Sequence, residues 1–380
     1  MIFAKRRTAE PTNESQLVPP GLAIAGAYGW RILVVLGLVA VLVFLVIEFR
    51  YIVVPFFVAI LLSALLVPLV NFLRRHRWPK ALAVAVAMLG TLGVVTGLVI
   101  LVVAQVRSGY PDLQEKTLLA YADFTQWLSQ PPLDISQDDI NVWVGGVWET
   151  IQRDNGAIVN GLLSVGSTAG HVIAGVLLAL FATLFILIDG RRIWTWIVRL
   201  FPQRARPAVT GAGEAGWITL TTFVKVQIFV AFVDAVGIGL GAWILGLFYG
   251  GFPLVIPIAV AVFLGAFVPV VGALLTGALA VFVALVYLGP LPAVLMLGIV
   301  LLVQQIEGHV LQPLVLGTAV KVHPLAVVFA VAAGGFTAGI AGALFAVPIV
   351  ATANVMVKYI AGGTWRTVPH PTAKDILPHA

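Results

Sequence analysis

The sequence predicts an all-α integral membrane protein with about eight transmembrane helices, some broken or re-entrant, and a small extracytoplasmic helical segment. Hydrophobic residues make up 61% of its 380 positions and charged residues only 10%, whereas soluble domains carry about 25% charged residues. Several apolar stretches reach the roughly 18 to 25 residues that a helix needs to cross a bilayer core of about 30 Å. These stretches are apolar throughout, so helices are expected rather than the alternating strands of a barrel.

Apolar stretches between clusters of charged residues define the candidate spans. They are residues 31–48, 51–72, 81–105, 161–188, 217–247, 253–287, 291–311 and 323–357. The expected organisation is a cytoplasmic tail at 1–30, spans one to three in 31–105, an extracytoplasmic segment at 106–160, span four at 161–188, a cytoplasmic loop at 189–215, spans five to eight in 216–360, and a cytoplasmic tail at 361–380.

Basic residues flank the apolar stretches on one side of the predicted topology. The "RRHRWPK" stretch at 74–80 and the arginines of the 189–215 loop are examples. Because Lys and Arg accumulate in cytoplasmic loops, both termini are expected in the cytoplasm and residues 107–160 outside. That outer segment holds eight acidic residues against three basic ones. The net charge of +6 is thereby explained without a soluble basic domain, and no nucleic-acid partner is expected.

The second half of the outer segment predicts an amphipathic helix. Ser136 followed by Asp139 is typical of an N-terminal capping box. Residues at steps of four and three then follow, all apolar except Asn155: Ile140, Val144, Val147, Ile151, Asn155, Ile158 and Leu162. A period of 3.5 favours a seam for packing against another helix, as in self-association. A helix that lies on the protein's own surface or on the membrane interface is the alternative.

Two of the later spans contain residues that interrupt helices. Span 253–287 carries "FVPVVG", with Pro269 and Gly272, and span 323–357 carries "AAGGFTAGIAG", with Gly334, Gly335 and Gly339. Paired interruptions at membrane depth indicate a substrate pathway in transporters. A proline kink with a close-packed glycine face is the alternative. Either break could also form a re-entrant hairpin, which would change the number of spans.

Polar side chains within the apolar half form the candidate substrate or ion pathway. They are Lys225, Gln227 and Asp234 in the fifth span and Gln304, Gln305, Glu307 and His309 at the end of the seventh. A charge at the bilayer centre costs about 3 kcal/mol, so such residues usually face a cavity or a partner. Glu307 beside His309 could exchange protons, and glutamine amides suit a hydroxyl-rich solute. Alternatively, Glu307 is solvated at the outer interface.

An enzyme is not expected. The sequence has no HExxH, GxSxG or Walker motif, its six histidines are dispersed, and it has no cysteine. No cofactor and no metal site are therefore predicted. Without a nucleotide site, uphill transport would depend on an ion or proton gradient.

Three stretches carry a resemblance to a known family. Val53–Arg75, "FVPVVG" and Gln304–Ala351 resemble the autoinducer-2 exporter family, also called PerM-like permeases, and the similarity extends from about residue 30 to 360. The resemblance implies a multi-pass protein of a prokaryotic inner membrane that assembles as a homo-oligomer, with pentamers in the family. It also implies export of a furanone-type quorum signal, as in some members, or sodium or lithium/proton antiport, as in others. Val226 and Asp234 depart from the family pattern.

The favoured interpretation is a secondary transporter that exports a small polar organic solute such as an autoinducer-2-like quorum signal. A cation/proton antiporter with Glu307 or Asp234 as proton carrier is the first alternative. An oligomeric membrane scaffold or passive pore, in which the acidic outer segment is the functional part, is the second.

Overall fold

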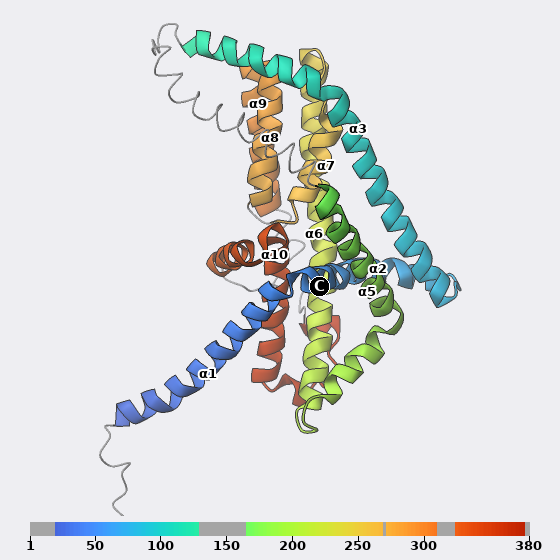
Figure 1. Ribbon diagram of the computed structural model, residues 1–380, viewed down its shortest axis with the longest axis vertical. Coiled ribbons are helices and arrows are strands. Elements are labelled where there is room, and N and C mark those ends of the chain that lie inside the picture. The colour runs from blue at the N-terminus through green and yellow to red at the C-terminus, as the bar shows by residue number, and fades with distance from the viewer. Residues whose placement is uncertain (1–19, 129–164, 269–270, 310–323, 377–380) are drawn as a thin grey trace, which may run out of the picture. The chain divides into compact units, whose positions relative to one another are not determined.

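The computed structural model describes residues 20–128, 165–268, 271–309 and 324–376 (Figure 1). Every regular element in these ranges is a helix, and eight helices are long and apolar enough to cross a membrane. The prediction of an all-α integral membrane protein is therefore confirmed. The chain divides into two units, residues 1–50 and residues 51–380.

The first unit consists of α1, Pro20–Glu48, in its described part. Its candidate span is Ala25–Glu48, 24 residues long, which is about 36 Å at 1.5 Å per residue. Apolar side chains lie on all sides of this helix, as is typical of a membrane span.

Three helices pack together at one end of the second unit. They are α2 (Arg50–Arg75), α3 (Lys80–Leu128) and α5 (Val165–Arg199). Their shared apolar cluster contains Leu66, Val70, Ala83, Val84, Ala87 and Leu187. Helix α5 is kinked at Asp189 (φ −124°, ψ 19°), and the Lys80 ammonium donates a hydrogen bond to the carbonyl of Ile188 beside the kink.

Two predicted boundaries in this region can be compared with the helices. The sequence interpretation ended the third span at residue 105, as the candidate span Lys80–Gln105 does, and α3 continues as helix beyond that span to Leu128. It also assigned 189–215 to a loop, whereas α5 reaches Arg199 and α6 begins at Arg206. Charged residues mark where a helix leaves lipid, and the helix itself can go on. The predicted amphipathic helix after Ser136 lies outside the described residues.

Helix α6, Arg206–Tyr249, is the element around which the second unit is built. Its 44 residues extend about 66 Å. The first half packs against α10, where Gly216 faces Met356 and Thr352. The second half packs against α7 and α9, where Gly239 faces Ala259 and Gly237 faces Val303. Small residues on α6 allow these close approaches.

The predicted sixth span is two helices, α7 (Val255–Gly265) and α8 (Val271–Leu288). The 11 residues of α7 rise about 16 Å, too little to cross a bilayer core of about 30 Å. The two helices form a hairpin closed by Gly265 and Gly272, because a Cβ on Gly272 would overlap the carbonyl of Gly265. We call residues 255–288 the first hairpin. Helix α9, Pro290–Ile306, follows and packs on α8 and α6.

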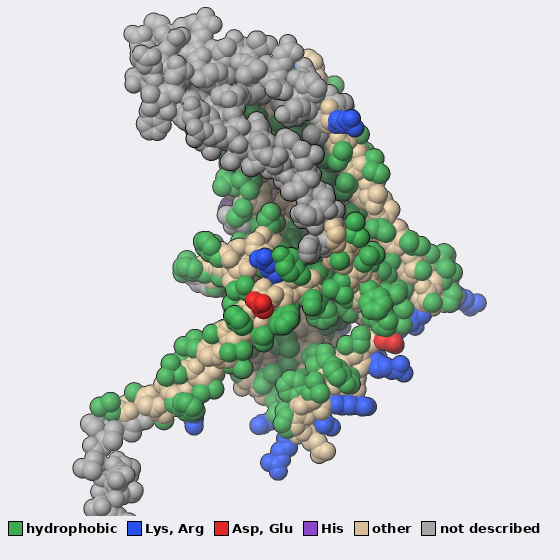
Figure 2. All heavy atoms as spheres, in the orientation of Figure 1, with side chains coloured by type: hydrophobic (Ala, Val, Ile, Leu, Met, Phe, Trp, Pro, Cys, Tyr) green, Lys and Arg blue, Asp and Glu red, His purple; other side chains and the backbone are tan. Residues whose placement is uncertain are grey.

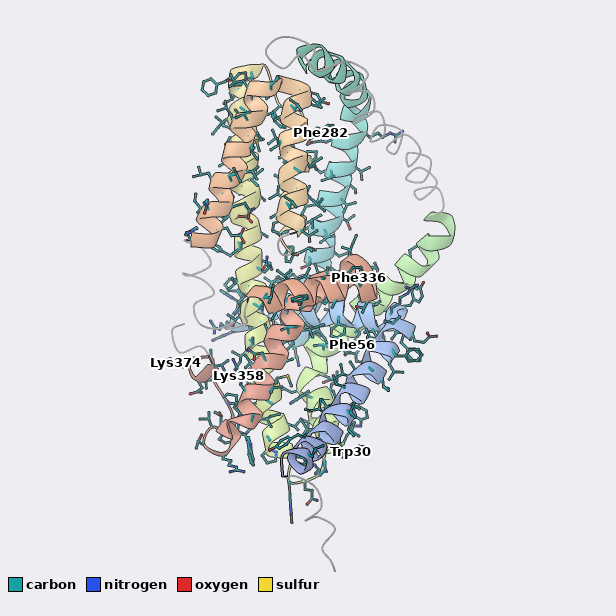
Figure 3. All side chains as sticks on the ribbon, turned by 90° about the vertical axis from the view of Figure 1, so that its left-hand side faces the viewer. Trp30, Phe56, Phe282, Phe336, Lys358 and Lys374 are labelled. Atoms are coloured by element: carbon teal, nitrogen blue, oxygen red, sulfur yellow. The ribbon has the colours of Figure 1, made fainter. Side chains whose placement is uncertain are left out.

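Helix α10, Pro324–Ala361, also reverses direction. Its backbone is non-helical at Ala338 and at Gly339 (φ 63°, ψ −146°), a conformation that is essentially restricted to glycine. The two limbs then meet at Gly334 and Gly342, whose added Cβ atoms would each overlap the other residue's carbonyl. Residues 324–361 form the second hairpin, and Phe336 lies at its tip (Figure 3). The predicted eighth span is therefore not one straight helix.

The end of the chain folds back on the start of α6. It contains η3 (Thr364–Arg366) and α11 (Ala373–Ile376). The Tyr359 hydroxyl donates to the carbonyl of Val368, and the His370 ring lies 3.1 Å from the Glu214 carboxylate. Hydrogen bonds from the hydroxyl and then the backbone N–H of Thr372 lower the pKa of Asp375 below its ordinary value. This tail ties the second limb of α10 to α6.

Candidate transport site

The interrupted helices meet near the middle of α6. The Gln227 amide donates a hydrogen bond of 2.7 Å to the carbonyl of Ala266, the residue after the last turn of α7. That carbonyl loses its helical partner when α7 ends, so Gln227 supplies the partner instead. Phe223 of α6 and Val268 of the first hairpin both pack against the apolar cluster of the second hairpin, which contains Val331, Ala343, Ala346 and Val347. This part of α6 therefore contacts both hairpins.

Asp234 lies on the same face of α6 as Gln227, because seven residues are close to two helical turns. It is 3% exposed, and its Oδ1 atom has no hydrogen-bond partner. Its position falls within the apolar stretch 217–247. A carboxyl group buried in such a place is costly unless a proton, a cation or a basic group neutralises it.

Glu307 is the charged neighbour of Asp234. Helices α6 and α9 run antiparallel, since Gly237 faces Val303 and Gly241 faces Ile299. A Cβ on Gly237 would lie 2.9 Å from the Val303 side chain, so the backbones are close. One turn further on each helix brings Glu307 beside Asp234, where the two carboxyl groups interact electrostatically. Glu307 is half-buried and caps the end of α9.

The other predicted pathway residues do not join this pair. Gln304 is half-buried on α9, whereas Gln305 and His309 are exposed, and the His309 ring bonds to the carbonyl of Gln305 at 3.2 Å. Lys225 is exposed and lies nine residues from Asp234, which places it on the opposite face of α6. The structure therefore brings together Asp234 and Glu307, with Gln227 two turns away.

The predicted helix-breaking residues have different positions. Gly272 is buried in the first turn of α8, and Pro269 lies outside the described residues. Gly339 forms the turn of the second hairpin and Gly334 closes its limbs. Gly335 is half-buried and has no close approach of this kind.

Sequence reasoning did not pair Gly272 with Gly265 or Gly334 with Gly342. The signal was present, because each break is flanked by two glycines seven or eight residues apart, Gly265 with Gly272 and Gly334 with Gly342. Such symmetry about a break indicates that the chain returns on itself with its backbones in contact.

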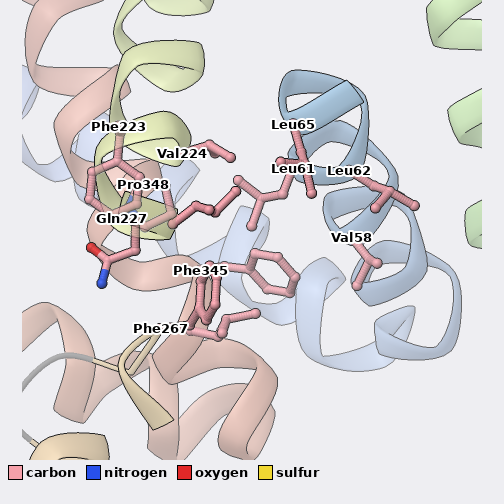
Figure 4. Close-up of a pocket in the computed structure, with 12 residues that line it drawn as sticks. Val58, Leu61, Leu62, Leu65, Phe223, Val224, Gln227, Phe267, Phe345 and Pro348 are labelled. Atoms are coloured by element: carbon pink, nitrogen blue, oxygen red, sulfur yellow. The ribbon is translucent and has the colours of Figure 1, made fainter. Parts of the chain in front are cut away.

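A cavity of about 180 Å³ lies between α2, α6, the turn of the first hairpin and the second limb of α10 (Figure 4). Its lining is Val58, Leu61, Leu62, Leu65, Phe223, Val224, Gln227, Ile228, Phe267, Leu344, Phe345 and Pro348. Gln227 is the one polar side chain in this lining, and its amide is bonded to Ala266. The cavity therefore suits an apolar group, and nothing in the sequence distinguishes its residues from ordinary span residues.

Metal-ligating side chains are not gathered in the described ranges, where no group of three or more His, Cys, Asp or Glu could hold a metal ion. The pair of Asp234 and Glu307 offers carboxyl oxygens for a proton or a single cation. That is the chemistry available to this site.

The fold and the site together define a multi-pass helical membrane protein with two interrupted helical segments and a pair of carboxyl groups, one buried and one half-buried. Comparison with known proteins gives the family: residues 32–362 match the model described as AI-2E family transporter, and the chain belongs to this family. It is therefore a transport protein of the permease type.

Two relatives cover almost the whole chain. A protein of Mycobacterium tuberculosis (strain CDC 1551 / Oshkosh) named "Putative transport protein MT0215" is 38% identical over 91% of this chain and 93% of its own length. The "AI-2 transport protein TqsA" of Escherichia coli (strain K12) is 23% identical over 88% of this chain and 94% of its own length. The "Putative transport protein YueF" of Bacillus subtilis (strain 168) is 26% identical over 51% of each chain.

Proposed function

We propose that this protein is a secondary transporter in which the acidic pair of Asp234 and Glu307 takes up the coupling proton or cation. The observation that carries the proposal is the Asp234 carboxyl group, buried within an apolar helix, with one oxygen unpartnered beside a second carboxyl group. Two carboxylates at close range repel each other, and a proton or a cation between them removes the repulsion. Loading and unloading of the pair changes the charge of the site.

The position of the pair favours coupling to movement of the hairpins. Asp234 is two turns from Gln227 on α6, and Gln227 holds the end of α7 through the Ala266 carbonyl. Glu307 ends α9, which packs on α8 of the first hairpin. A change of charge at the pair therefore acts on elements that contact both broken helices. Broken helices of this kind surround the substrate in secondary transporters.

The transported solute is a small polar organic molecule, exported in the manner of an autoinducer-2-like signal. Support comes from the name of the Escherichia coli relative and from the family description. The half-buried Gln304 and the acidic pair supply polar contacts, whereas the apolar cavity beside Gln227 does not. The solute is therefore expected on the α9 side of α6.

The proposed location is the inner membrane of a prokaryote. The basic segments at 74–80 and 189–215 and both termini then lie in the cytoplasm, as the charge distribution favours. A homo-oligomer is proposed from the family resemblance. No catalytic activity and no cofactor are part of the proposal.

Flux in proteoliposomes tests the function. Purified protein is reconstituted, and uptake of hydroxylated furanones is measured with and without an imposed pH or sodium gradient. Accumulation that requires a gradient supports a coupled transporter. Equal downhill flux with and without a gradient would indicate a passive pore and contradict the proposal.

Cation/proton antiport is a second candidate, favoured by the same acidic pair. Two carboxyl groups that exchange a proton for a cation need no organic solute. Sodium or lithium flux driven by a pH gradient in the absence of any solute would favour antiport. Solute-dependent proton movement would favour solute export.

A further inference from the structure

Six basic side chains from three segments lie at the end of the second unit where α2, α3 and α5 pack together. We call them the basic surface, which consists of Arg74, Arg75, Arg77, Lys80, Arg191 and Arg192. All six are exposed. Figure 2 shows that Lys and Arg side chains gather over this part of the molecule, with few acidic ones among them.

Hydrogen bonds within the turn and apolar packing below it hold the backbone that carries the basic surface. The turn between α2 and α3 contains Arg77 at φ 65°, which is in the left-handed region. Backbone bonds from His76 to the Leu73 carbonyl and from Arg77 to the Arg74 carbonyl close this turn. Below it, Leu66, Val70 and Val84 pack with Leu187 of α5. The backbone that carries the arginines of the turn is therefore fixed.

Lys80 links this turn to the arginines of α5. Its ammonium group donates to the carbonyl of Ile188, next to the kink at Asp189. Arg191 and Arg192 follow within the next turn of α5. Residues more than 100 positions apart in the chain thus present their charges at the same end of the helices.

None of the six basic side chains forms an ion pair with another residue that the structure describes. Their positive charges are therefore not balanced by a described acidic group. Uncompensated positive charge at a fixed surface favours an anionic partner.

Exposed aromatic residues accompany the basic surface. Phe72 and Trp78 lie within the same turn, and Trp196 is exposed on the arm of α5 beyond the kink. Tryptophan is enriched where a membrane meets water. The same arm exposes Ile193 and Leu200, so apolar and basic side chains share one surface. A soluble anion would bind the basic side chains without contacting the apolar ones.

We propose that the basic surface binds the phosphate headgroups of anionic phospholipids. Arginine forms paired hydrogen bonds with phosphate oxygens, and basic clusters beside membrane helices bind anionic lipid. A headgroup held between the α2–α3 turn and the arm of α5 links the two segments. Anionic lipid therefore stabilises the packing of α2, α3 and α5.

Lipid titration of the purified full-length protein tests the proposal. Phosphatidylglycerol or phosphatidylcholine with identical acyl chains is added to protein in a neutral detergent. Native mass spectrometry counts the bound lipids, and the midpoint of thermal unfolding is measured. We expect several-fold more bound phosphatidylglycerol than phosphatidylcholine, and a rise in the midpoint with phosphatidylglycerol alone.

Two triple variants with the same change of charge supply the comparison. The test variant is Arg74→Gln, Arg75→Gln and Arg191→Gln, which leaves Arg77 and Lys80 in their structural places. The matched control is Lys358→Gln, Arg366→Gln and Lys374→Gln, three exposed basic residues of α10 and the tail. The test variant should lose most of the phosphatidylglycerol binding and of the rise in midpoint, and the control should keep both.

Three results would overturn the proposal. The first is equal binding of the two lipids by the wild-type protein. The second is the same loss, or the same retention, in both triple variants. The third is a rise in midpoint with inorganic phosphate equal to that with phosphatidylglycerol, which would show a general anion site.

Discussion

The two hairpins are closed in the same way and differ in how much of each is packed against other helices. Each reverses the chain and is closed by two glycines, Gly265 with Gly272 and Gly334 with Gly342. The first hairpin is enclosed, because α7 packs on α6 and α3 while α8 packs on α9. The tip of the second hairpin is open, with Phe336 and Ile340 93% and 84% exposed.

The difference indicates which hairpin moves. Gln227 bonds the first hairpin to α6 at Ala266, so its turn is fixed to the helix that carries Asp234. The second hairpin turns at Gly339, where nothing lies within 4 Å of the position of an added Cβ, and its tip is exposed. Segments with few buried contacts open at low free-energy cost. We therefore expect the first hairpin to stay fixed to α6 and the second hairpin to move relative to the first.

Gly272→Ala is expected to have the largest effect on stability. The new Cβ would overlap the Gly265 carbonyl, and enclosure by α6, α3 and α9 leaves the hairpin no room to open. The free energy of unfolding should fall by about 3 kcal/mol, the upper end for overpacking a core. Denaturant unfolding in detergent measures it. Gly298→Ala is the control, since nothing lies within 4 Å of its Cβ position, and an equal loss there would contradict the interpretation.

Gly342→Ala sharpens the comparison. It creates the same kind of backbone overlap, with Gly334, but the second hairpin can relieve it by opening. The expected loss is about 1 to 2 kcal/mol, accompanied by a change in the distance between the two limbs. Spin labels on exposed residues of the limbs measure that distance. A loss as large as that of Gly272→Ala, without any change in distance, would show that both hairpins are held equally.

Gln227→Leu tests the bond that holds the first hairpin. The substitution keeps the apolar character of the cavity but leaves the Ala266 carbonyl without its partner. The free energy of unfolding should fall by about 1 kcal/mol, and hydrogen exchange should rise near residues 266–268. Gln305→Leu, at an exposed position, should change neither quantity. Unchanged hydrogen exchange in Gln227→Leu would contradict the interpretation that Gln227 holds the first hairpin on α6.

Acid should have the smallest effect, confined to the tail that ties α10 to α6. The hydrogen bonds from Thr372 lower the pKa of Asp375, so their contribution is present above the ordinary pKa of aspartate and is lost as the pH falls through the lower folded value. Hydrogen exchange of residues 372–376, corrected for intrinsic rates, should rise below about pH 4. Asp375→Asn should show no such pH dependence, and a wild-type tail unchanged by acid would contradict this.

Hydropathy was sufficient to predict the helical class and the approximate positions of the spans, because a lipid environment imposes length and apolarity on each helix. It did not predict that α5 continues to Arg199, since a helix can continue beyond its apolar stretch. The breaks near Pro269 and Gly339 were visible as residue types, but only the backbone geometry shows that both are reversals.

The site was partly predictable for a different reason. Asp234 was singled out because a carboxyl group is costly in an apolar stretch. Its neighbour Glu307 lies 73 positions away on another helix, and only the packing of Gly237 on Val303 brings them together. The role of Gln227 was hidden because its partner is a backbone carbonyl, for which a sequence carries no signal.

Gradient-driven accumulation by Asp234→Asn in proteoliposomes tests the central claim most directly. Asparagine keeps the size of the side chain and cannot exchange a proton. The variant should lose dependence on the pH or sodium gradient, while the control Lys225→Gln, on the exposed face of α6, should keep it. Accumulation by Asp234→Asn at the wild-type level, under the same gradient, would contradict coupling through the acidic pair.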